Sequence, residues 1–205
     1  MVDLRKVDPT KANLDHEKSR IRFVEVNDPE EKKRLWEIET DPEVARFVED
    51  LSETEEDMLA FTKVGCDYLV LAVCGKEGHV DDSEVNKLQG WLTIYKEEKK
   101  RLSRFVKEGV IDLVLAGKRI LEVGFARHPK AKSGQMASAL RQTLAMLQKE
   151  HQKDGEHELI VTAYVDETNL ASVRVLEAAG FRMVAKVKYH LKNKSFDHFF
   201  IWDGK

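Results

Sequence analysis

The chain has 205 residues, of which 42% are hydrophobic and 35% charged, with four prolines and two cysteines. A domain of this length buries enough apolar surface to fold without a disulfide framework or a structural metal. No window approaches the roughly 18 apolar residues of a membrane span, and residues 1–20 lack the apolar core of a signal peptide. We therefore expect a cytoplasmic protein without membrane contact, made of a polar arm over residues 1–20 and one domain over residues 21–205.

Charge is divided unevenly along the chain, although the net charge is only −3. Residues 1–90 carry a net charge of −10 and residues 91–205 a net charge of +7. The small total argues against a dedicated nucleic-acid binder. Two halves of opposite charge favour a cationic partner for the first half and an anionic partner for the second, because a local potential raises the encounter rate of a complementary ligand. Chance decoration of the surface explains the same division equally well.

The first ninety residues predict a strand, three helices and two further strands. In chain order these are Ile21–Val26, a helix from Pro29 toward Glu39, a helix from Pro42, a helix from Ser52, and strands Asp67–Cys74 and Leu88–Tyr95. Asp28 precedes a proline at the first helical position, which is typical of a capped helix start. The first strand is rich in β-branched residues.

The second part of the chain predicts alternating strands and helices. In chain order these are a basic helical insert Glu97–Lys107, strand Ile120–Arg127 with Val110–Leu115 as a hairpin partner, helix Ser133–His151, strand Leu159–Val165, helix Asn169–Ala179, and strands Phe181–Tyr189 and Phe196–Trp202. Gly180 is the expected left-handed cap of the last helix, with Phe181 as its hydrophobic contact. The order predicts a mixed α/β sheet with helices on its faces.

The segment from residue 121 to residue 140 has the features of an anion-binding loop. Small residues open its helix, and they let a ligand approach the free N–H groups of a helix N-terminus. Lys130 and Lys132 add positive charge, and Gly124 inside the strand indicates a bulge or a close approach. Alternatively, Gly134 is only a turn residue and Ser133 only a helix cap.

Two motifs in this order resemble the GNAT superfamily of amine N-acetyltransferases. Asn169, Ser172 and Gly180-Phe181 match the family's last helix, most closely in the branch that acetylates the N-termini of ribosomal proteins. The loop over residues 132–137 is similar to the acetyl-CoA signature, with a lysine in place of Arg or Gln and a glutamine in place of the middle glycine.

The resemblance implies a mostly antiparallel central sheet with splayed central strands, helices on both faces, and acetyl-CoA in the splay. It assigns cofactor contacts to Phe125, Ala126, Arg127, Lys132, Ser133, Gly134, Gln135, Met136, Ala137, Asn169 and Ser172. Asn169 is expected on the pantetheine arm and Ser172 near the thioester sulfur. Both residues are otherwise only helix caps.

Acetyl transfer needs a base, an oxyanion site and a proton for the departing thiolate. Glu122 resembles the strand glutamate that takes the amine proton in some members, although a structural carboxylate is the alternative. The backbone N–H near Ala126 or Arg127 is the expected oxyanion donor. Many members protonate the thiolate with a tyrosine where this chain has Leu176, so the acid becomes Ser172 or, second, Tyr164.

Three further residues bear on the base. The alternative to Glu122 is a water held by Tyr189 and His190, because the resemblance places these residues near a catalytic glutamate of some branch members, although Leu191 occupies the position of that glutamate. His128, before a proline, is expected to be a surface loop residue, and the seven histidines show no metal-like spacing.

The sequence thus predicts an acetyl-CoA-dependent N-acetyltransferase that works by direct attack in a ternary complex. The alternative is a catalytically silent acyl-CoA-binding or regulatory module of the same fold. The acceptor is an amine, and a protein N-terminus, a polyamine and an aminoglycoside all stay open because acceptor loops carry specificity. A monomer and a homodimer are both compatible with the sequence.

Overall fold

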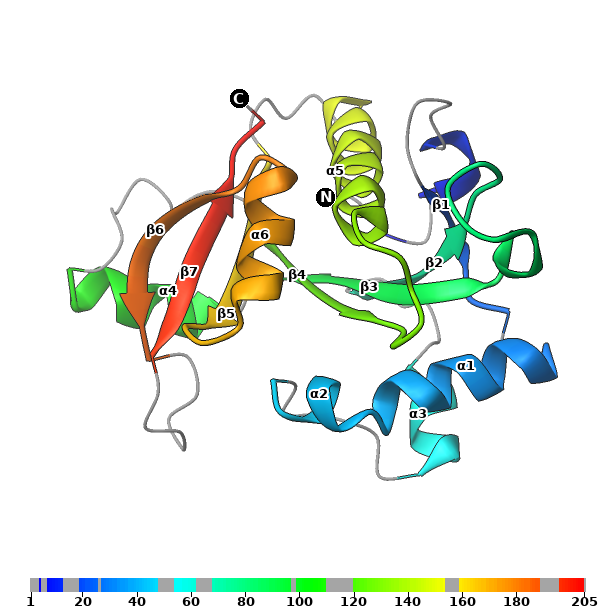
Figure 1. The fold of residues 1–205 in the computed structure, drawn as a ribbon. Helices are drawn as coiled ribbons and strands as arrows, with labels where there is room; N and C mark the ends of the chain where they lie inside the picture. Colours follow the sequence, from blue (N-terminus) through cyan, green and yellow to red (C-terminus); the bar gives the residue numbers. More distant parts are fainter. Residues whose placement is uncertain are drawn as a thin grey trace.

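A seven-stranded sheet in the order β1-β2-β3-β4-β5-β7-β6 forms the centre of the molecule (Figure 1). The computed structural model describes residues 4, 7–12, 19–25, 27–47, 54–61, 68–96, 99–109, 120–153, 159–188 and 196–204. The strands are β1 Ser19–Phe23, β2 Tyr68–Gly75, β3 Leu88–Lys96, β4 Ile120–Arg127, β5 Ile160–Asp166, β6 Arg182–Val187 and β7 Asp197–Trp202. Within this sheet only β4 and β5 are parallel neighbours, which confirms the expected mixed, mostly antiparallel architecture.

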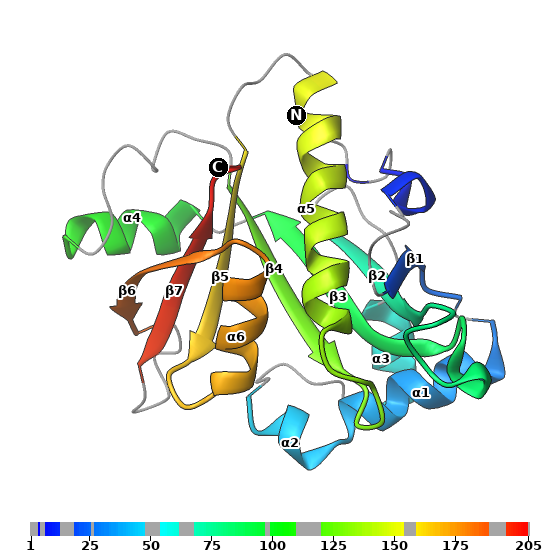
Figure 2. The ribbon, with the colours of Figure 1, turned by 45° about the horizontal axis from the view of Figure 1, so that its top comes forward.

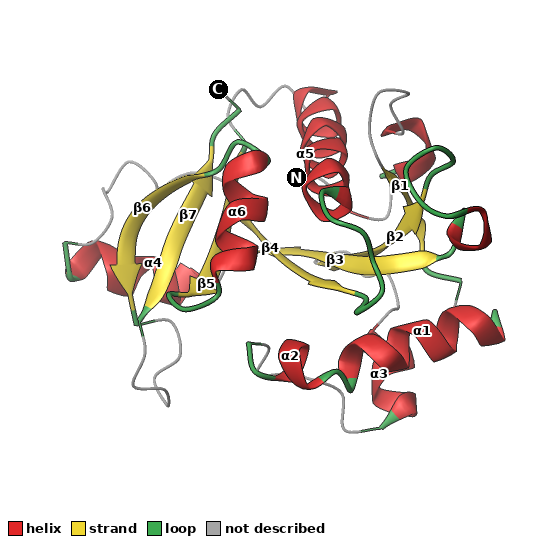
Figure 3. Cartoon of the chain, viewed as in Figure 1, coloured by secondary structure: helices red, strands yellow, loops and turns green. Residues whose placement is uncertain are grey.

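Helices cover both faces of the sheet, as expected (Figures 1 and 3). They are α1 Pro29–Glu39, α2 Pro42–Ala45, α3 Glu55–Phe61, α4 Lys99–Lys107, α5 Gln135–Lys153 and α6 Leu170–Ala178. Helices α5 and α6 pack on one face, where Leu140, Leu144 and Leu176 join the largest apolar cluster. We call this the α5 face, and the opposite one the α1 face. None of the described helices is long and apolar enough to cross a membrane.

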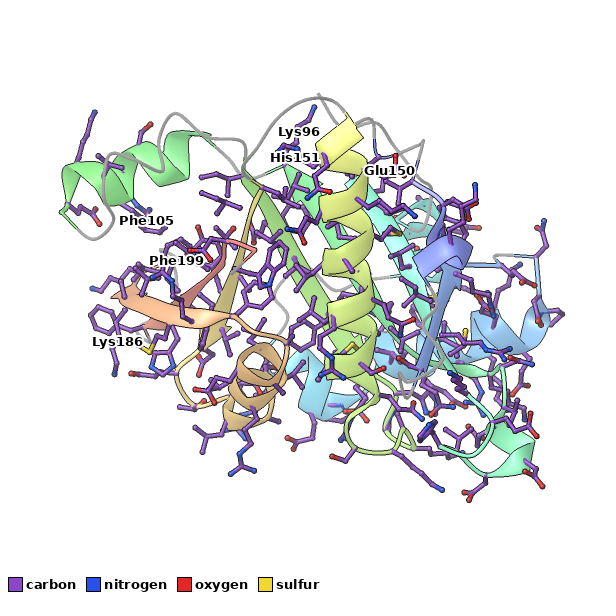
Figure 4. All side chains as sticks on the ribbon, turned by 90° about the horizontal axis from the view of Figure 1, so that it is seen from above. Lys96, Phe105, Glu150, His151, Lys186 and Phe199 are labelled. Carbon is purple, nitrogen blue, oxygen red and sulfur yellow. The ribbon has the colours of Figure 1, made fainter. Side chains whose placement is uncertain are left out.

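The α1 face is covered by two separate groups of side chains. Over β2, β3 and β4, the helices α1 and α3 contribute Leu35, Ile38 and Met58 to a second apolar cluster. Over β5, β6 and β7, the insert helix α4 contributes Phe105, which is fully buried and approaches Phe199 of β7 (Figure 4). Strand β4 takes part in both groups, with Ala126 in the first and Ile120 in the second.

Local signals in the sequence account for the helix ends. Asp28 accepts hydrogen bonds from the N–H groups of Glu30 and Glu31, and Pro29 follows it at the first helical position. At the end of α6, the Gly180 N–H donates to the Glu177 carbonyl and the Phe181 N–H to the Leu176 carbonyl. Gly180 has a φ of +91°, so this is the expected left-handed glycine cap.

The N-terminal boundary differs from the prediction. Strand β1 begins at Ser19 rather than Ile21 and ends at Phe23 rather than Val26. Its start is fixed by α5, since the Ser19 hydroxyl donates to the Gln135 carbonyl and the Ser19 carbonyl accepts from Gln142 Nε2. Leu4 and Val7 are buried in the cluster on the α5 face, so these parts of the expected arm pack against the domain.

An ion pair joins α1 to the loop between β2 and β3. The two terminal guanidinium nitrogens of Arg34 donate to the Glu84 carboxylate at 2.8 Å, and Gln89 Nε2 donates to the same carboxylate at 2.9 Å. The hydrogen bonds from Arg34 lower the pKa of Glu84 to about 2. Helix α1 is thereby held against the start of β3.

Candidate active site

The central strands of the sheet separate, and this is the feature around which the site is built. Strand β4 pairs with β5 only from Ile120 to Glu122, opposite Ile160 to Thr162. Beyond those residues β4 stays paired with β3 along its whole length, and β5 stays paired with β7. The two strands therefore diverge toward their C-terminal ends, with α6 beside the opening (Figure 2). The expected splay is present.

The backbone of β4 turns alternate peptide groups toward this splay. The Thr162 hydroxyl donates to the Leu121 carbonyl at 3.2 Å, so Leu121 faces β5, whereas the His128 N–H donates to Gln89 of β3. Because a strand alternates, the N–H and C=O groups of Val123, Phe125 and Arg127 also face the splay. An extended ligand placed there meets a row of backbone donors and acceptors.

This alternation corrects one expectation. Ala126 pairs with Trp91 of β3 and its peptide group faces that strand, while its side chain is buried in the cluster on the α1 face. Of the two amides expected to polarise a carbonyl, only that of Arg127 faces the splay. The amide of Phe125 faces it as well.

Glu122 lies where the splay begins, on the α1 face. Its side chain is only 3% exposed, and Tyr95 of β3 donates its hydroxyl to Glu122 Oε1 at 2.7 Å. The expected base is therefore a buried, hydrogen-bonded carboxylate at the apex of the diverging strands. Tyr95 carries no sequence motif and was not among the expected residues. Its pairing position opposite Glu122 could have been found only from the register of β3 and β4.

The two candidate acids lie on opposite faces of β5. Tyr164 packs in the cluster under α4 and stacks on Phe199 with ring centroids 5.0 Å apart. Ser172 lies on α6, which packs on the α5 face of the sheet. On that face β5 contributes Ala163 and Val165 to the apolar cluster. The structure therefore does not bring Tyr164 and Ser172 together, and Tyr164 shares its face with Glu122.

The start of α5 forms the expected small-residue loop. Gly134 has a φ of +85°, a conformation that favours glycine, and it precedes the first helical residue, Gln135. Ser133 and Lys132 are exposed, and Lys132 Nζ pairs with Asp81 of the β2–β3 loop at 2.9 Å. The first N–H groups of a helix of this length lack intrahelical partners and carry a partial positive charge.

The next three residues present only their backbone to that loop. Met136 and Ala137 are buried in the apolar core or against it, and Met136 leaves so little room that a Cβ at Gly90 would lie 2.6 Å from its methyl group. Gln135 is 2% exposed, and its amide group makes no hydrogen bond within the described part of the chain. The side chains of these three residues are thus buried, and only their backbone is left for the cofactor contacts that the sequence predicts.

Asn169 has the capping role that the sequence offered as an alternative. Its Oδ1 accepts a hydrogen bond from the Ser172 N–H at 3.1 Å, and both residues are half-buried at the start of α6. Leu176 is fully buried in the core, so this position offers no polar group to the site.

His128 differs from its expectation, since it is not a surface residue. It is 1% exposed, and its Nε2 lies 2.7 Å from Glu37 Oε2 of α1. Its Nδ1 accepts from the Lys130 N–H at 3.2 Å, which leaves Nε2 as the donor of the neutral ring. The hydrogen bond lowers the pKa of Glu37. The partner is 91 residues away, so no local pattern reveals it.

Other chemistries find little support in the described residues. These residues contain no cluster of His, Cys, Asp and Glu able to hold a metal ion. Cys74 is buried, and burial raises the pKa of its thiol to about 11, so it is not a thiolate at neutral pH. Tyr189, His190, Leu191 and the segment Val110–Leu115 lie outside the described residues.

Comparison with known proteins identifies the family. The model of the acetyltransferase (GNAT) domain matches residues 20–182, which is more than half of the chain. The chain belongs to this family. No curated protein matches the chain significantly.

Solved structures share the GNAT fold of this chain at low sequence identity. A GNAT acetyltransferase from Bacillus anthracis superposes with a TM-score of 0.62 at 22% identity and covers 91% of this chain and 95% of its own. The yncA protein of Salmonella typhimurium, solved with acetyl-CoA, gives 0.55 at 18% identity, covering 91% and 94%. Spermidine N-acetyltransferase from Vibrio cholerae, solved with CoA and spermine, gives 0.61 at 10% identity, covering 91% and 95%.

Proposed function

We propose that this GNAT protein transfers the acetyl group of acetyl-CoA to a primary amine by direct attack in a ternary complex. The observation that carries the proposal is the opening between β4 and β5, where a buried carboxylate, Glu122, lies at the apex of a row of outward-facing peptide groups. The opening offers backbone recognition, and the carboxylate offers a proton acceptor beside it.

The residues present suit acetyl-CoA. The peptide groups of Val123, Phe125 and Arg127 would pair with the pantetheine arm as a further strand does, and the first turn of α5 would hold the pyrophosphate with its N–H groups. Lys132 adds charge there, because its ion pair with Asp81 is largely exposed and readily exchanged for a phosphate. When bound, acetyl-CoA supplies a thioester, whose carbonyl is activated toward amines.

This chain supplies the proton transfers and the oxyanion site. Glu122 takes a proton from the attacking amine at a carboxylate oxygen, directly or through a water molecule. The N–H groups of Phe125 and Arg127 face the splay and stabilise developing negative charge on an oxygen placed there. Ser172 on the α5 face and Tyr164 on the α1 face are the two sources of a proton for the leaving sulfur.

A cationic acceptor fits the part of the α1 face that α1, α2 and α3 cover, whereas the basic helix α4 covers another part. The helices α1, α2 and α3 come from the acidic half of the chain, and α2 lies near the diverging ends of β4 and β5 (Figures 1 and 2). The Vibrio cholerae relative with spermine bound acts on an amine of this kind. A ribosomal-protein N-terminus stays the specific candidate from the form of the motif at Asn169 to Phe181.

A panel of amines tests the proposal. The purified protein with acetyl-CoA is offered spermidine, an aminoglycoside and peptides with free N-termini, and release of free thiol is followed together with the mass of the amine. We expect thiol release coupled to a mass increase of one acetyl group for at least one class. If acetyl-CoA raises the melting temperature but no amine releases thiol, the silent binding module is the correct function.

A further inference from the structure

Strand β3 carries two polar side chains against the apex of the splay. On the α1 face, Tyr95 is the register partner of Glu122, and Thr93 is the register partner of Gly124. Partners directly opposite each other in an antiparallel pair share a face and lie in contact. Tyr95 is half-buried and Thr93 only 5% exposed, so neither is a solvated surface residue.

Tyr95 fixes the carboxylate of Glu122. Its hydroxyl donates to Oε1 at 2.7 Å, a distance typical of a hydrogen bond to a carboxylate oxygen. Such a bond stabilises the ionised form of a buried carboxyl group and restricts its rotation. The orientation of the carboxylate relative to the splay is therefore set from β3.

Next to this pair, the missing side chain of Gly124 leaves a niche on the α1 face. A Cβ at this position would lie 2.7 Å from Thr93 Oγ1, and no other atom of the described residues beyond its chain neighbours lies within 4 Å. The φ of Gly124 is not in the left-handed region, so the backbone itself does not require glycine. The lack of room for a Cβ beside Thr93, rather than the backbone conformation, explains why this residue is a glycine.

We propose that β3 forms one wall of the reaction site. In this proposal Tyr95 is a positioning residue that holds Glu122, and Thr93 with Gly124 bounds the niche in which the attacking nitrogen lies. The proposal rests on the proposed function, because it assigns these residues to the acceptor side of the same transfer. It extends the site to a strand that no motif marks.

Tyr95 is one of several titratable groups on the α1 face, and its hydroxyl is hydrogen-bonded to Glu122 Oε1. Other titratable groups lie on this face as well, namely Tyr68 of β2, Tyr164 of β5, His128 after β4, and Glu31, Arg34, Glu37 and Glu39 of α1. The covering helices α3 and α4 contribute the apolar Met58 and Phe105. Tyr68 is the register partner of Tyr95, and its side chain packs against the apolar cluster on the same face, so it offers a matched control.

The first test compares Tyr95→Phe with Tyr68→Phe. The carboxyl titration of Glu122 is followed by carbon NMR in the free protein, and kcat is measured against pH at saturating acetyl-CoA. We expect Tyr95→Phe to move both the titration and the acid limb of kcat to higher pH, and to lower kcat roughly tenfold at neutral pH. Tyr68→Phe should leave both profiles in place. Unchanged profiles in Tyr95→Phe would overturn the positioning role.

The second test fills the niche. Gly124→Ala should raise the KM for the amine and lower kcat several-fold, while calorimetry shows unchanged affinity for acetyl-CoA. Thr93→Ala in the same background removes the contact with Oγ1 but leaves the niche filled, so the double variant should stay impaired. Recovery of activity in the double variant would show that the contact between the new Cβ and Thr93 Oγ1 alone caused the loss. It would overturn the role of the niche in holding the attacking nitrogen.

Glu122→Gln separates this proposal from the function on which it depends. If Glu122→Gln turns over like the wild type, the base itself is misassigned and the proposed mechanism fails. If Glu122→Gln is inactive while Tyr95→Phe and Gly124→Ala behave like the wild type, only the role of β3 is overturned. A thermal melt of each variant shows that it is folded.

Discussion

At the scale of the residue, the chemistry depends on Glu122, whose burial and hydrogen bond suit either a base or a structural carboxylate. Glu122→Gln is nearly isosteric and keeps hydrogen bonding but removes the proton acceptor. We expect kcat to fall roughly 10²–10⁴-fold at neutral pH with acetyl-CoA affinity near wild type. Raising the pH should partly restore turnover, because more of the amine is then deprotonated in solution.

The pH profile distinguishes the two roles of Glu122. A structural glutamate would show lowered stability without recovery at high pH. A change in turnover of less than about threefold, well under 1 kcal/mol of barrier, would exclude Glu122 as the base. The search would then pass to Tyr189 and His190.

Gly134 tests the phosphate loop at the same scale. Gly134→Asp places a carboxylate where the pyrophosphate should meet the first N–H groups of α5, so acetyl-CoA affinity should fall roughly tenfold or more. Gly134→Asn is the control, because it has the same size, tolerates the positive φ of this position equally well and carries no charge. Calorimetric titration with acetyl-CoA measures both variants. Equal affinities for the two variants would contradict an anion site at this loop.

At the scale of the element, α6 depends on a cap that also belongs to the proposed cofactor site. Asn169→Ala removes the acceptor for the Ser172 N–H and should cost about 1 kcal/mol of unfolding free energy. Asn169→Asp keeps that acceptor but loses the amide donor. If the amide binds the pantetheine arm, the aspartate variant keeps its stability and shows a raised KM for acetyl-CoA. A normal KM for acetyl-CoA in a stable Asn169→Asp protein would show that Asn169 acts only as a helix cap.

The elements also show what a sequence can and cannot reveal. Strand β4 has the predicted bounds and the last helix has its predicted glycine cap, because both depend on local residue patterns. The start of β1 depends on hydrogen bonds from Ser19 to α5, more than a hundred residues away, and was missed. Within the site, the motifs led to Glu122 and the loop of α5. Tyr95 and His128 act through partners that only the folded chain brings close.

At the scale of the whole molecule, part of the uneven charge of the sequence is divided between the two faces. The acidic half of the chain forms α1, α2 and α3 on the α1 face, where Glu122 lies. The basic half forms the loop before α5, where a polyanionic cofactor fits (Figure 2), but it also forms the insert helix α4, which has five basic and no acidic residues and covers another part of the α1 face. A cationic acceptor would then approach the splay beside α1, α2 and α3, and an anionic cofactor from the opposite face, each toward a complementary potential.

This division predicts a salt dependence that differs between acceptors. For a polyamine such as spermine, the KM should rise roughly threefold or more from about 50 to about 300 mM salt, because screening weakens the attraction to the α1 face. A monoamine should change less. Replacing the exposed Glu43 of α2 and Glu56 of α3 by glutamine should raise the KM for spermine at low salt and flatten its salt dependence. Glu177→Gln, an exposed acid on α6, is the matched control and should do neither, because α6 covers the other face. A KM for spermine that is independent of salt, or equal effects of the two sets of substitutions, would show that the charge division is decoration without a role in acceptor capture.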